Sequence, residues 1–161
     1  LLTGCRYGEI VRMTVQDLIG PRIYIPVTKS GHPRSAYLTE EGEKFFASYA
    51  AGKTSAQRLF LKADGTPWGK SHQNRPMQKA CALAKINPPI SFHILRHTYS
   101  AKLAQRGTPL QVIAKAIGDS DTRIVEKHYA HLAPDYVLAT LRKKLPEMGV
   151  DVPNVVAIKQ R

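Results

Sequence analysis

Five side chains, spread over most of the chain, are of the types needed to attack a phosphodiester without a metal ion: Arg6, Lys29, His93, Arg96 and Tyr129. An arginine offers two parallel N–H donors to a phosphate, so two guanidinium groups can neutralise its non-bridging oxygens in the transition state, the work that magnesium does elsewhere. The phenol of Tyr129 can serve as the nucleophile, and Lys29 or His93 can donate a proton to the leaving sugar oxygen. A phenol with an ordinary pKa near ~10 needs a cationic pocket or a base, and this set supplies both.

The segment HILRH brings two of these groups close together. His93 and Arg96 are three residues apart and therefore neighbours on one face of a predicted helix, with Ile94 and Leu95 expected to point toward the core. Taken alone, the segment is better explained by a surface arginine and a core histidine. His93 and His97 have the i, i+4 spacing of zinc ligands, but the arginine between them repels a cation and no glutamate is adjacent. We therefore expect neither a metal site nor a cofactor.

The other positions have local support of their own. Arg6 follows a Thr-Gly turn at the start of a predicted helix, and Glu9, three residues later, can hold its guanidinium group. Lys29 ends a predicted strand beside a glycine turn, from which a flexible cationic arm can reach into a cleft. Tyr129 lies between two histidines in HYAH. Such a tyrosine is more often a packing residue, and it is interpreted as a nucleophile only because the cationic set lacks one.

The charge of the chain indicates a polyanionic partner. Lysine and arginine number 24 against 12 acidic residues, which gives a net charge of +12 over 161 residues. The basic residues are spread along the chain and form no amphipathic helix rich in Trp or Phe, so nucleic acid is favoured over a membrane surface. No apolar run approaches the ~18 residues of a membrane span. Structural RNA-binding proteins share this charge signature, so charge alone does not imply catalysis.

The pattern of elements predicts an α+β fold, mainly α-helical, with one small antiparallel sheet. Alternating residues over 22–27 and 34–38 predict a hairpin, and Pro26 suggests an edge strand because it lacks an N–H. Thr39 is a plausible N-cap for a helix that stops near Gly52. Cys5 and Cys81 form no zinc spacing and are expected to be buried thiols. Further helices are predicted at about 3–13, 71–85, 92–105, 109–116, 121–128 and 134–145. The segment 108–129, which holds two of them, has the helix–Gly–helix pattern of a helix-turn-helix, although any short helical hairpin produces it.

Four motifs in this order resemble those of the tyrosine recombinases, the phage-integrase-type site-specific DNA recombinases. They are TGCRYGE at 3–9, TKSG at 28–31, SFHILRHT at 91–98 and IGDSDTRIVEKHYAH at 117–131. Each motif alone is weak, but together they span nearly the whole chain to about residue 145. The resemblance implies an integrase-like DNA breaking-rejoining fold without cofactors, and double-stranded DNA as the partner.

The resemblance also assigns roles to residues. It implies that Arg6 and Arg96 are the catalytic arginines, that Lys29 is the general acid of the hairpin, and that His93 belongs to the H-x-x-R pair. Tyr129 matches the nucleophile, which would form a 3′-phosphotyrosyl intermediate and rejoin strands without ATP or metal. The supporting positions are less defined: Glu9 is implied to support the pocket, His97 to pack rather than react, and His131, in the same motif as the tyrosine, has no assigned role.

One position departs from the family pattern. In the family, the glycine of an L-G-H-like element in the fourth motif is usually followed by His or Trp, but here Gly118 is followed by Asp119. A carboxylate near a scissile phosphate would be repelled by about a kcal/mol or more. Two interpretations remain: Asp119 hydrogen-bonds Lys29 or an arginine and holds it in place, or the domain has diverged and only binds DNA.

The leading hypothesis is thus the catalytic domain of a site-specific DNA recombinase or integrase over residues 1–145, with an N-terminal helix expected to be truncated. It would act in the bacterial cytoplasm or nucleoid as a tetramer on DNA, with a prophage or mobile element as one source. A type IB topoisomerase would use similar residues, and the alternatives from other classes are a non-catalytic DNA-binding or regulatory module and a structural RNA-binding protein. The tail, residues 146–161, and the leucine stripe before it fit docking on a neighbouring subunit and packing on their own domain equally well.

Overall fold

The computed structural model describes residues 1–28, 31–119, 122–129 and 142–144, and within α6 the side chains of two residues are not described. The described chain is mainly helical with one small antiparallel sheet, as the sequence predicts. The helices are α1 (Tyr7–Ile10), α2 (Glu40–Ala50), α3 (Asn74–Leu83), α4 (Phe92–Gln105), α5 (Leu110–Ile117) and α6 (Thr122–Tyr129), with a short 3-10 turn η1 at Val15–Asp17. None of the described helices is long and apolar enough to cross a membrane.

The sheet has three antiparallel strands in the order β1-β2-β3: β1 (Leu18–Ile19), β2 (Arg22–Ile25) and β3 (Arg34–Tyr37). The predicted hairpin is confirmed, since Ile23 pairs with Ala36 and Ile25 with Arg34. Along β2 the buried isoleucines alternate with exposed residues, as period-two patterning requires. The edge-strand prediction is wrong, because β2 is the middle strand. Pro26 lies just beyond the end of β2, where its missing N–H is not needed by the ladder.

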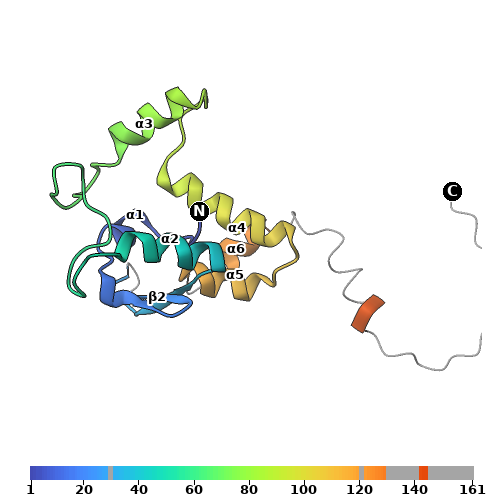
Figure 1. Ribbon diagram of the computed structural model, residues 1–161. Helices are drawn as coiled ribbons and strands as arrows, with labels where there is room; N and C mark the ends of the chain where they lie inside the picture. The colour runs from blue at the N-terminus through green and yellow to red at the C-terminus, as the bar shows by residue number, and fades with distance from the viewer. Residues whose placement is uncertain (29–30, 120–121, 130–141, 145–161) are drawn as a thin grey trace, which may run out of the picture.

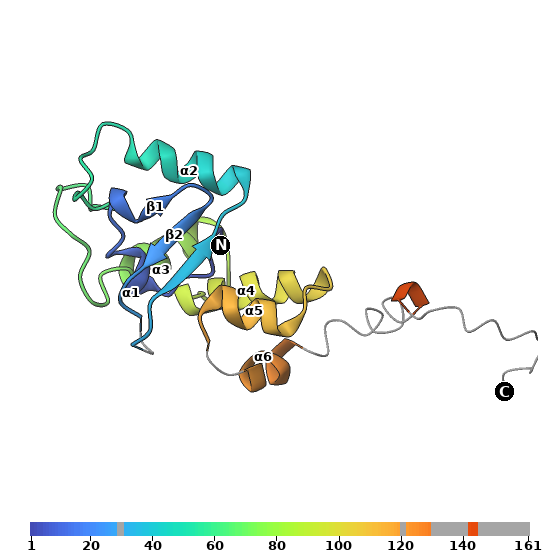
Figure 2. The ribbon, with the colours of Figure 1, turned by 90° about the horizontal axis from the view of Figure 1, so that it is seen from below.

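The sheet and α2 form the first apolar core of the molecule. We call it the sheet core, and its buried residues are Cys5, Met13, Ile23, Ile25, Ala36, Phe46 and Leu59. The helix α2 begins at the predicted cap, because the Thr39 hydroxyl accepts a hydrogen bond from the Gly42 N–H at 3.2 Å. Figure 2 shows α2 beside the sheet, on the side away from α6. Both cysteines are buried and free, as expected.

The helices α4, α5 and α6 form a second apolar core, which we call the helical core. Its buried residues are Ala104, Ile113, Ala114, Ile117 and Val125, and Figure 1 shows the three helices packed together. The helix predicted at 92–105 has these bounds in the structure, and the other two begin and end within one residue of prediction. The expectation that Ile94 points toward the core is wrong, because its side chain is 45% exposed.

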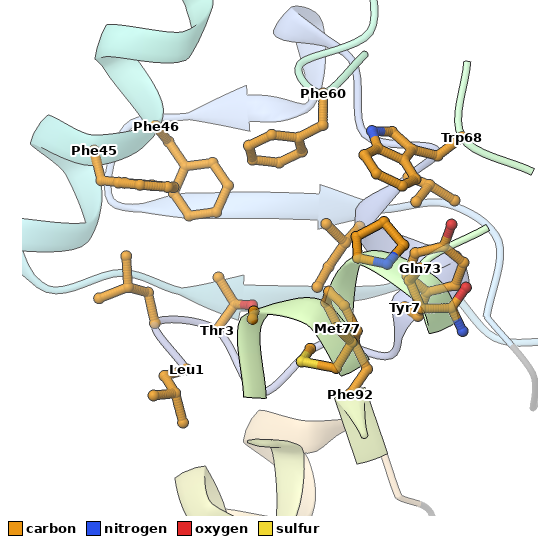
Figure 3. A pocket seen from close by; sticks show the side chains of 15 residues that line it. Leu1, Thr3, Tyr7, Phe45, Phe46, Phe60, Trp68, Gln73, Met77 and Phe92 are labelled. Carbon is orange, nitrogen blue, oxygen red and sulfur yellow. The ribbon is translucent and has the colours of Figure 1, made fainter. Parts of the chain in front are cut away.

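The helix α3 stands away from the sheet in Figure 1. It begins three residues later than predicted, because Ser71 has φ 66° and cannot belong to a right-handed helix. Between α3, α1 and α2 lies an apolar cavity of about 460 Å³, seen in Figure 3, whose lining includes Tyr7, Phe46, Phe60, Trp68 and Met77. The predicted helix at 134–145 and the tail at 146–161 lie outside the described residues, apart from 142–144, which are helical.

Candidate active site: arginines and carboxylates between the two cores

Arg6 stands at the N-cap of α1, at the edge of the sheet core. Its backbone N–H donates to Glu9 Oε2 at 2.8 Å, and its Nη1 lies 3.4 Å from Glu9 Oε1. Its Nη2 donates to Asp119 Oδ1 at 2.6 Å, across a separation of 113 residues. The side chain keeps 28% of its surface exposed. The expected contact with Glu9 is therefore present, and the guanidinium group remains accessible from solvent.

Arg96 is buried, with its side chain only 6% exposed, and it joins three parts of the chain. Its Nη1 donates to Gly4 O at 2.9 Å and to Ile117 O at 2.7 Å, while its Nη2 donates to Asp119 Oδ1 at 3.0 Å. Gly4 has φ 61°, and a Cβ there would run into the ring of Tyr99. The alternative of a surface arginine and a core histidine is reversed, since Arg96 is buried and His93 is exposed.

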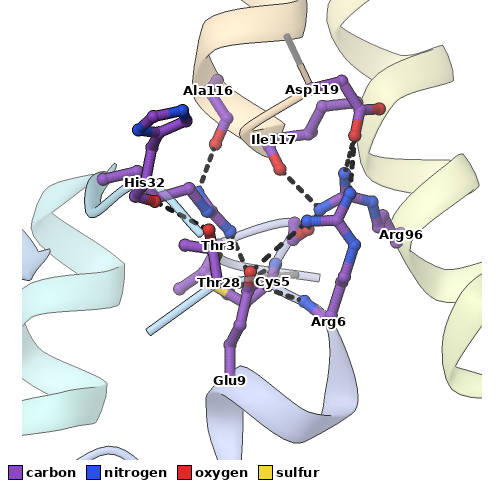
Figure 4. Close-up of polar contacts among 12 residues, drawn as sticks. Thr3, Cys5, Arg6, Glu9, Thr28, His32, Arg96, Ala116, Ile117 and Asp119 are labelled. Carbon is purple, nitrogen blue, oxygen red and sulfur yellow. Dashed lines mark hydrogen bonds and ion pairs between the residues drawn. The ribbon is translucent and has the colours of Figure 1, made fainter. Parts of the chain in front are cut away.

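Asp119 is the meeting point of the two arginines, as Figure 4 shows. One carboxylate oxygen, Oδ1, accepts hydrogen bonds from the Nη2 atoms of both Arg6 and Arg96. The position of this carboxylate is set by the end of α5, where Gly118 adopts the left-handed conformation with φ 70° and the Asp119 N–H donates to Ala114 O at 3.0 Å. Of the two contacts considered from the sequence, the structure shows the one with arginine.

Arg34 is the member of the cluster that sequence reasoning missed. Its Nη2 donates to Glu9 Oε2 at 2.7 Å and lies 3.4 Å from Cys5 Sγ, and its Nη1 donates to Ala116 O at 2.9 Å. The side chain is 8% exposed, so it is a buried cation whose main ionic partner is Glu9. A signal existed in the sequence: Arg34 shares the inward face of β3 with Ala36, two residues on, where a charged residue needs a buried partner.

These contacts determine the protonation properties of the cluster. Burial would raise the pKa of Glu9, but hydrogen bonds from Arg34 and from the Arg6 backbone, together with both arginine charges, bring it below its ordinary value. Burial lowers the pKa of the Arg96 guanidinium, the charge of Arg6 lowers it further, and Asp119 opposes both. The arginines thus repel each other, and the carboxylates offset that repulsion.

Three histidines continue the site from α4 to α6. The ring centroids of His93 and His97 are 4.5 Å apart, and those of His97 and His128 are 5.7 Å apart. Burial lowers the pKa of His97, and the neighbouring charges of His93 and His128 lower it further. His128 immediately precedes Tyr129, the last residue of α6, so the ring contact with His97 brings the end of α6 beside α4, one helical turn from His93.

Several predicted site residues have no described side chain. Lys29 and His131 lie outside the described residues, and of Tyr129 the structure describes only its place in α6. Within the described part of the chain, no group of three or more His, Cys, Asp or Glu side chains could hold a metal ion. The structure therefore brings together Arg6, Arg96, Glu9 and Asp119, adds Arg34, and places His93 on the same helix as Arg96.

Comparison with solved structures identifies the fold. The fold is that of tyrosine recombinase and integrase catalytic domains: the crystal structure of XerA recombinase superposes with a TM-score of 0.71 at 21% identity, over 91% of this chain and 55% of that chain. The catalytic domain of bacteriophage HP1 integrase gives a TM-score of 0.66 at 23% identity, over 92% of this chain and 79% of that one.

The sequence places the chain within a family. Residues 1–135 match the phage integrase family, and the chain belongs to it. It is 36% identical to the integrase of Salmonella phage P22 over an alignment of 174 positions, which covers 100% of this chain and 44% of that protein. It is 29% identical to the tyrosine recombinase XerA of Saccharolobus solfataricus over 137 residues, 83% of this chain and 43% of that protein. The chain thus spans less than half the length of these two relatives.

Proposed function

We propose that this chain is the catalytic domain of a site-specific DNA recombinase that cleaves and rejoins DNA strands through a phosphotyrosyl intermediate. The observation that carries the proposal is the convergence of Arg6 Nη2 and Arg96 Nη2 on a single oxygen, at 2.6 and 3.0 Å. Two guanidinium groups that share one oxygen atom form a site for an oxyanion, and a phosphodiester offers such oxygens. The net charge of +12 adds non-specific attraction to the DNA backbone.

In the proposed reaction the phenol oxygen of Tyr129 attacks the scissile phosphorus. As the P–O bond to the tyrosine forms, the phenolic proton is released to water. The bond to the 5′-oxygen breaks, and the proton for that oxygen comes from Lys29 or from His93, whose exposed side chain can reach a substrate. Arg6 and Arg96 stabilise the charge that grows on the non-bridging oxygens. Attack by a free 5′-hydroxyl then reverses the step and rejoins the strand, because the phosphotyrosyl bond conserves the energy of the broken one.

The partners in this proposal are double-stranded DNA and further copies of the protein. Integrase of the transposon Tn1549 has been solved in complex with circular intermediate DNA, and its fold superposes on this chain with a TM-score of 0.69 at 20% identity. A tetramer on DNA would let two subunits cleave in each strand exchange. Residues 146–161 are proposed as a tail that docks on a neighbouring subunit.

A covalent-trapping experiment tests the proposal. The protein is incubated in EDTA with a pool of nicked duplexes of random sequence around the nick, and adducts are sought on a denaturing gel. We expect an adduct that is absent in Tyr129→Phe and retained in Tyr49→Phe, a matched control on the exposed face of α2. An adduct that forms in a parallel incubation with Mg²⁺ but not in EDTA would contradict the metal-free mechanism.

A second candidate function, a DNA-binding domain without cleavage, is favoured by one observation. The carboxylate of Asp119 already occupies the Nη2 donors of both arginines. This alternative predicts salt-dependent DNA binding in the same experiment without any adduct, and an unchanged result in Tyr129→Phe.

A further inference from the structure

The Nη1 and Nη2 atoms of Arg6 and Arg96 have different partners, and this difference determines how an anion can enter the site. The Nη1 atom of Arg96 is engaged by the carbonyl oxygens of Gly4 and Ile117, and that of Arg6 faces Glu9. These contacts hold the guanidinium groups in the fold. The Nη2 atoms point at one common position, and Asp119 Oδ1 stands there. A phosphate oxygen that is to receive both Nη2 donors must take the place of this carboxylate oxygen.

The charges give the carboxylate a reason to be there when DNA is absent. Arg96 is buried and is repelled by Arg6, and Asp119 is the group that offsets this repulsion from the side of α5. A phosphate carries a negative charge of its own, so it can offset the same repulsion, and it would be repelled by a carboxylate left beside it. The two anions therefore compete for one pair of cations.

We propose that Asp119 is an internal counter-anion that fills the Arg6–Arg96 site in the DNA-free protein and is displaced when a phosphate binds. Asp119 would thus occupy the anion site of the DNA-free protein, and the free energy needed to displace it would weaken the binding of phosphate by the same amount. The anion-binding part of this inference stands on the geometry alone; its extension to the phosphodiester of DNA rests on the proposed function.

The surroundings of Asp119 allow the side chain to leave without unfolding the helix end. The backbone is fixed by the bond from the Asp119 N–H to Ala114 O and by Gly118, whose left-handed turn packs against Arg34. The side chain itself keeps 17% of its surface exposed. It lines a cavity of about 310 Å³ that is also lined by Lys115 and His32. Rotation into this cavity brings the displaced carboxylate toward another cationic side chain, Lys115.

The test measures binding of inorganic phosphate by titration calorimetry, with no DNA present. Asp119→Asn keeps the shape of the side chain but removes its charge, and we expect phosphate to bind it on the order of tenfold more tightly or better than the wild-type protein. The matched control is Asp64→Asn, which removes the same charge from an exposed turn away from the site. An equal gain in the control, or no gain in Asp119→Asn, would overturn the proposal.

A second pair of variants shows whether the gain arises at the arginine pair. In Arg6→Gln the Nη2 donor that meets Asp119 is gone, so adding Asp119→Asn to this variant should give little further gain in phosphate affinity. A gain that persists in full would overturn the proposal, because it would place the effect elsewhere.

The dependence of the melting temperature on phosphate concentration is an independent measure of phosphate binding, which can be used even if Asp119→Asn is less stable than the wild-type protein. The variant leaves the two arginines without their counter-anion, so its melting temperature should rise with phosphate concentration more steeply than that of the wild-type protein. Asp119→Ser serves as the second variant and should respond in the same way. Equal slopes in wild type and both variants would overturn the inference.

The inference and the proposed function can fail separately. Tighter phosphate binding by Asp119→Asn with no covalent DNA adduct in any variant would support the counter-anion and reject the recombinase. A wild-type adduct together with unchanged phosphate affinity in Asp119→Asn would support the recombinase and reject the counter-anion.

Discussion

The two apolar cores of the molecule differ in how they are built and in what they contribute to the site. The sheet core collects buried residues from strands, loops and α2 between positions 5 and 59, whereas the helical core is made by three consecutive helices between positions 104 and 125. Arg6, Glu9 and Arg34 are attached to the first core, and Arg96 and Asp119 to the second. The candidate site is therefore a polar seam between cores, and its geometry exists only when both are folded and docked.

The polar contacts across this seam are buried or partly buried. Arg96 reaches Gly4, Arg6 reaches Asp119, and Arg34 reaches the carbonyl of Ala116 at the end of α5. Each donor is a guanidinium group, which can satisfy several acceptors in a fixed planar arrangement. Arg6 and Arg96 thus also join the two halves of the molecule, and substitutions in them are expected to affect stability as well as phosphate binding.

The largest effect is expected from Arg96→Met. The substitution removes the bonds to Gly4 and Ile117 and leaves Asp119 with one arginine fewer. Removing one partner of a buried ion pair costs about 3–5 kcal/mol, so urea denaturation should show a loss of that order. Arg12→Met, at an exposed position just before Met13 of the sheet core, is the control, and its free energy of unfolding should lie within about 0.5 kcal/mol of the wild-type value. Similar losses in both variants would argue against a seam held by Arg96.

The next largest effect on stability is expected from substitutions that destabilise one core at a time. Ile113→Ala in the helical core and Ile23→Ala in the sheet core each remove a fully buried side chain and should cost about 2–5 kcal/mol. Amide hydrogen exchange should then increase mainly in α4–α6 for the first variant and mainly in β1–β3 for the second. The same uniform increase in both variants would mean that the cores unfold as a single unit.

A smaller effect concerns the pH dependence of the sheet side of the seam. The pKa of Glu9 is lowered in the folded protein, so its contribution to stability is complete above its ordinary value of about 4.5 and is lost as the pH falls through the folded value. The free energy of unfolding of the wild-type protein should therefore decrease below that pH. In Glu9→Gln this part of the decrease should be absent, and parallel curves for the two proteins would show that another carboxyl is responsible.

The smallest effect is expected at the far side of the sheet core. Thr39→Ala removes the N-cap bond to the Gly42 N–H and should cost about 1 kcal/mol. Because α2 contributes none of the cluster side chains, phosphate affinity should not change in this variant. A change in phosphate affinity would show that the sheet core and the site are coupled more tightly than the contacts indicate.

The helical core was the more predictable half from the sequence. Its helices α5 and α6 have strong apolar periodicity, and clear ends lie at Pro109 and Gly118, so the bounds could be predicted to within one residue. In the sheet core the hairpin and the Thr39 cap were predictable because their signals are local. The central place of β2 was not, since it depends on β1, a strand of two residues that has no pattern of its own.

In the site, too, contacts between residues close in sequence could be predicted more readily than contacts between distant ones. The pairing of Arg6 with Glu9 follows from a spacing of three residues. The contact of Asp119 with an arginine was one of the alternatives that the sequence left open. The partnership of Arg34 with Glu9 joins residues 25 apart. The inward face of β3 indicates that Arg34 needs a buried partner, but no local pattern tells which acidic residue it is. The roles of Lys29, Tyr129 and His131 stay predictions, because the structure does not describe their side chains.

The left-handed turn at Gly118 has a consequence for how this domain can be altered. The turn places the backbone of the next residue beside the arginine pair, so that a side chain at position 119 lies within reach of both guanidinium groups, as Asp119 does. Position 119 can therefore exchange an acceptor for a donor, or a charge for a neutral group, without rebuilding any helix. The fold thus offers one residue at which the strength of anion binding can be retuned by a single codon change while the scaffold of the two cores stays as it is.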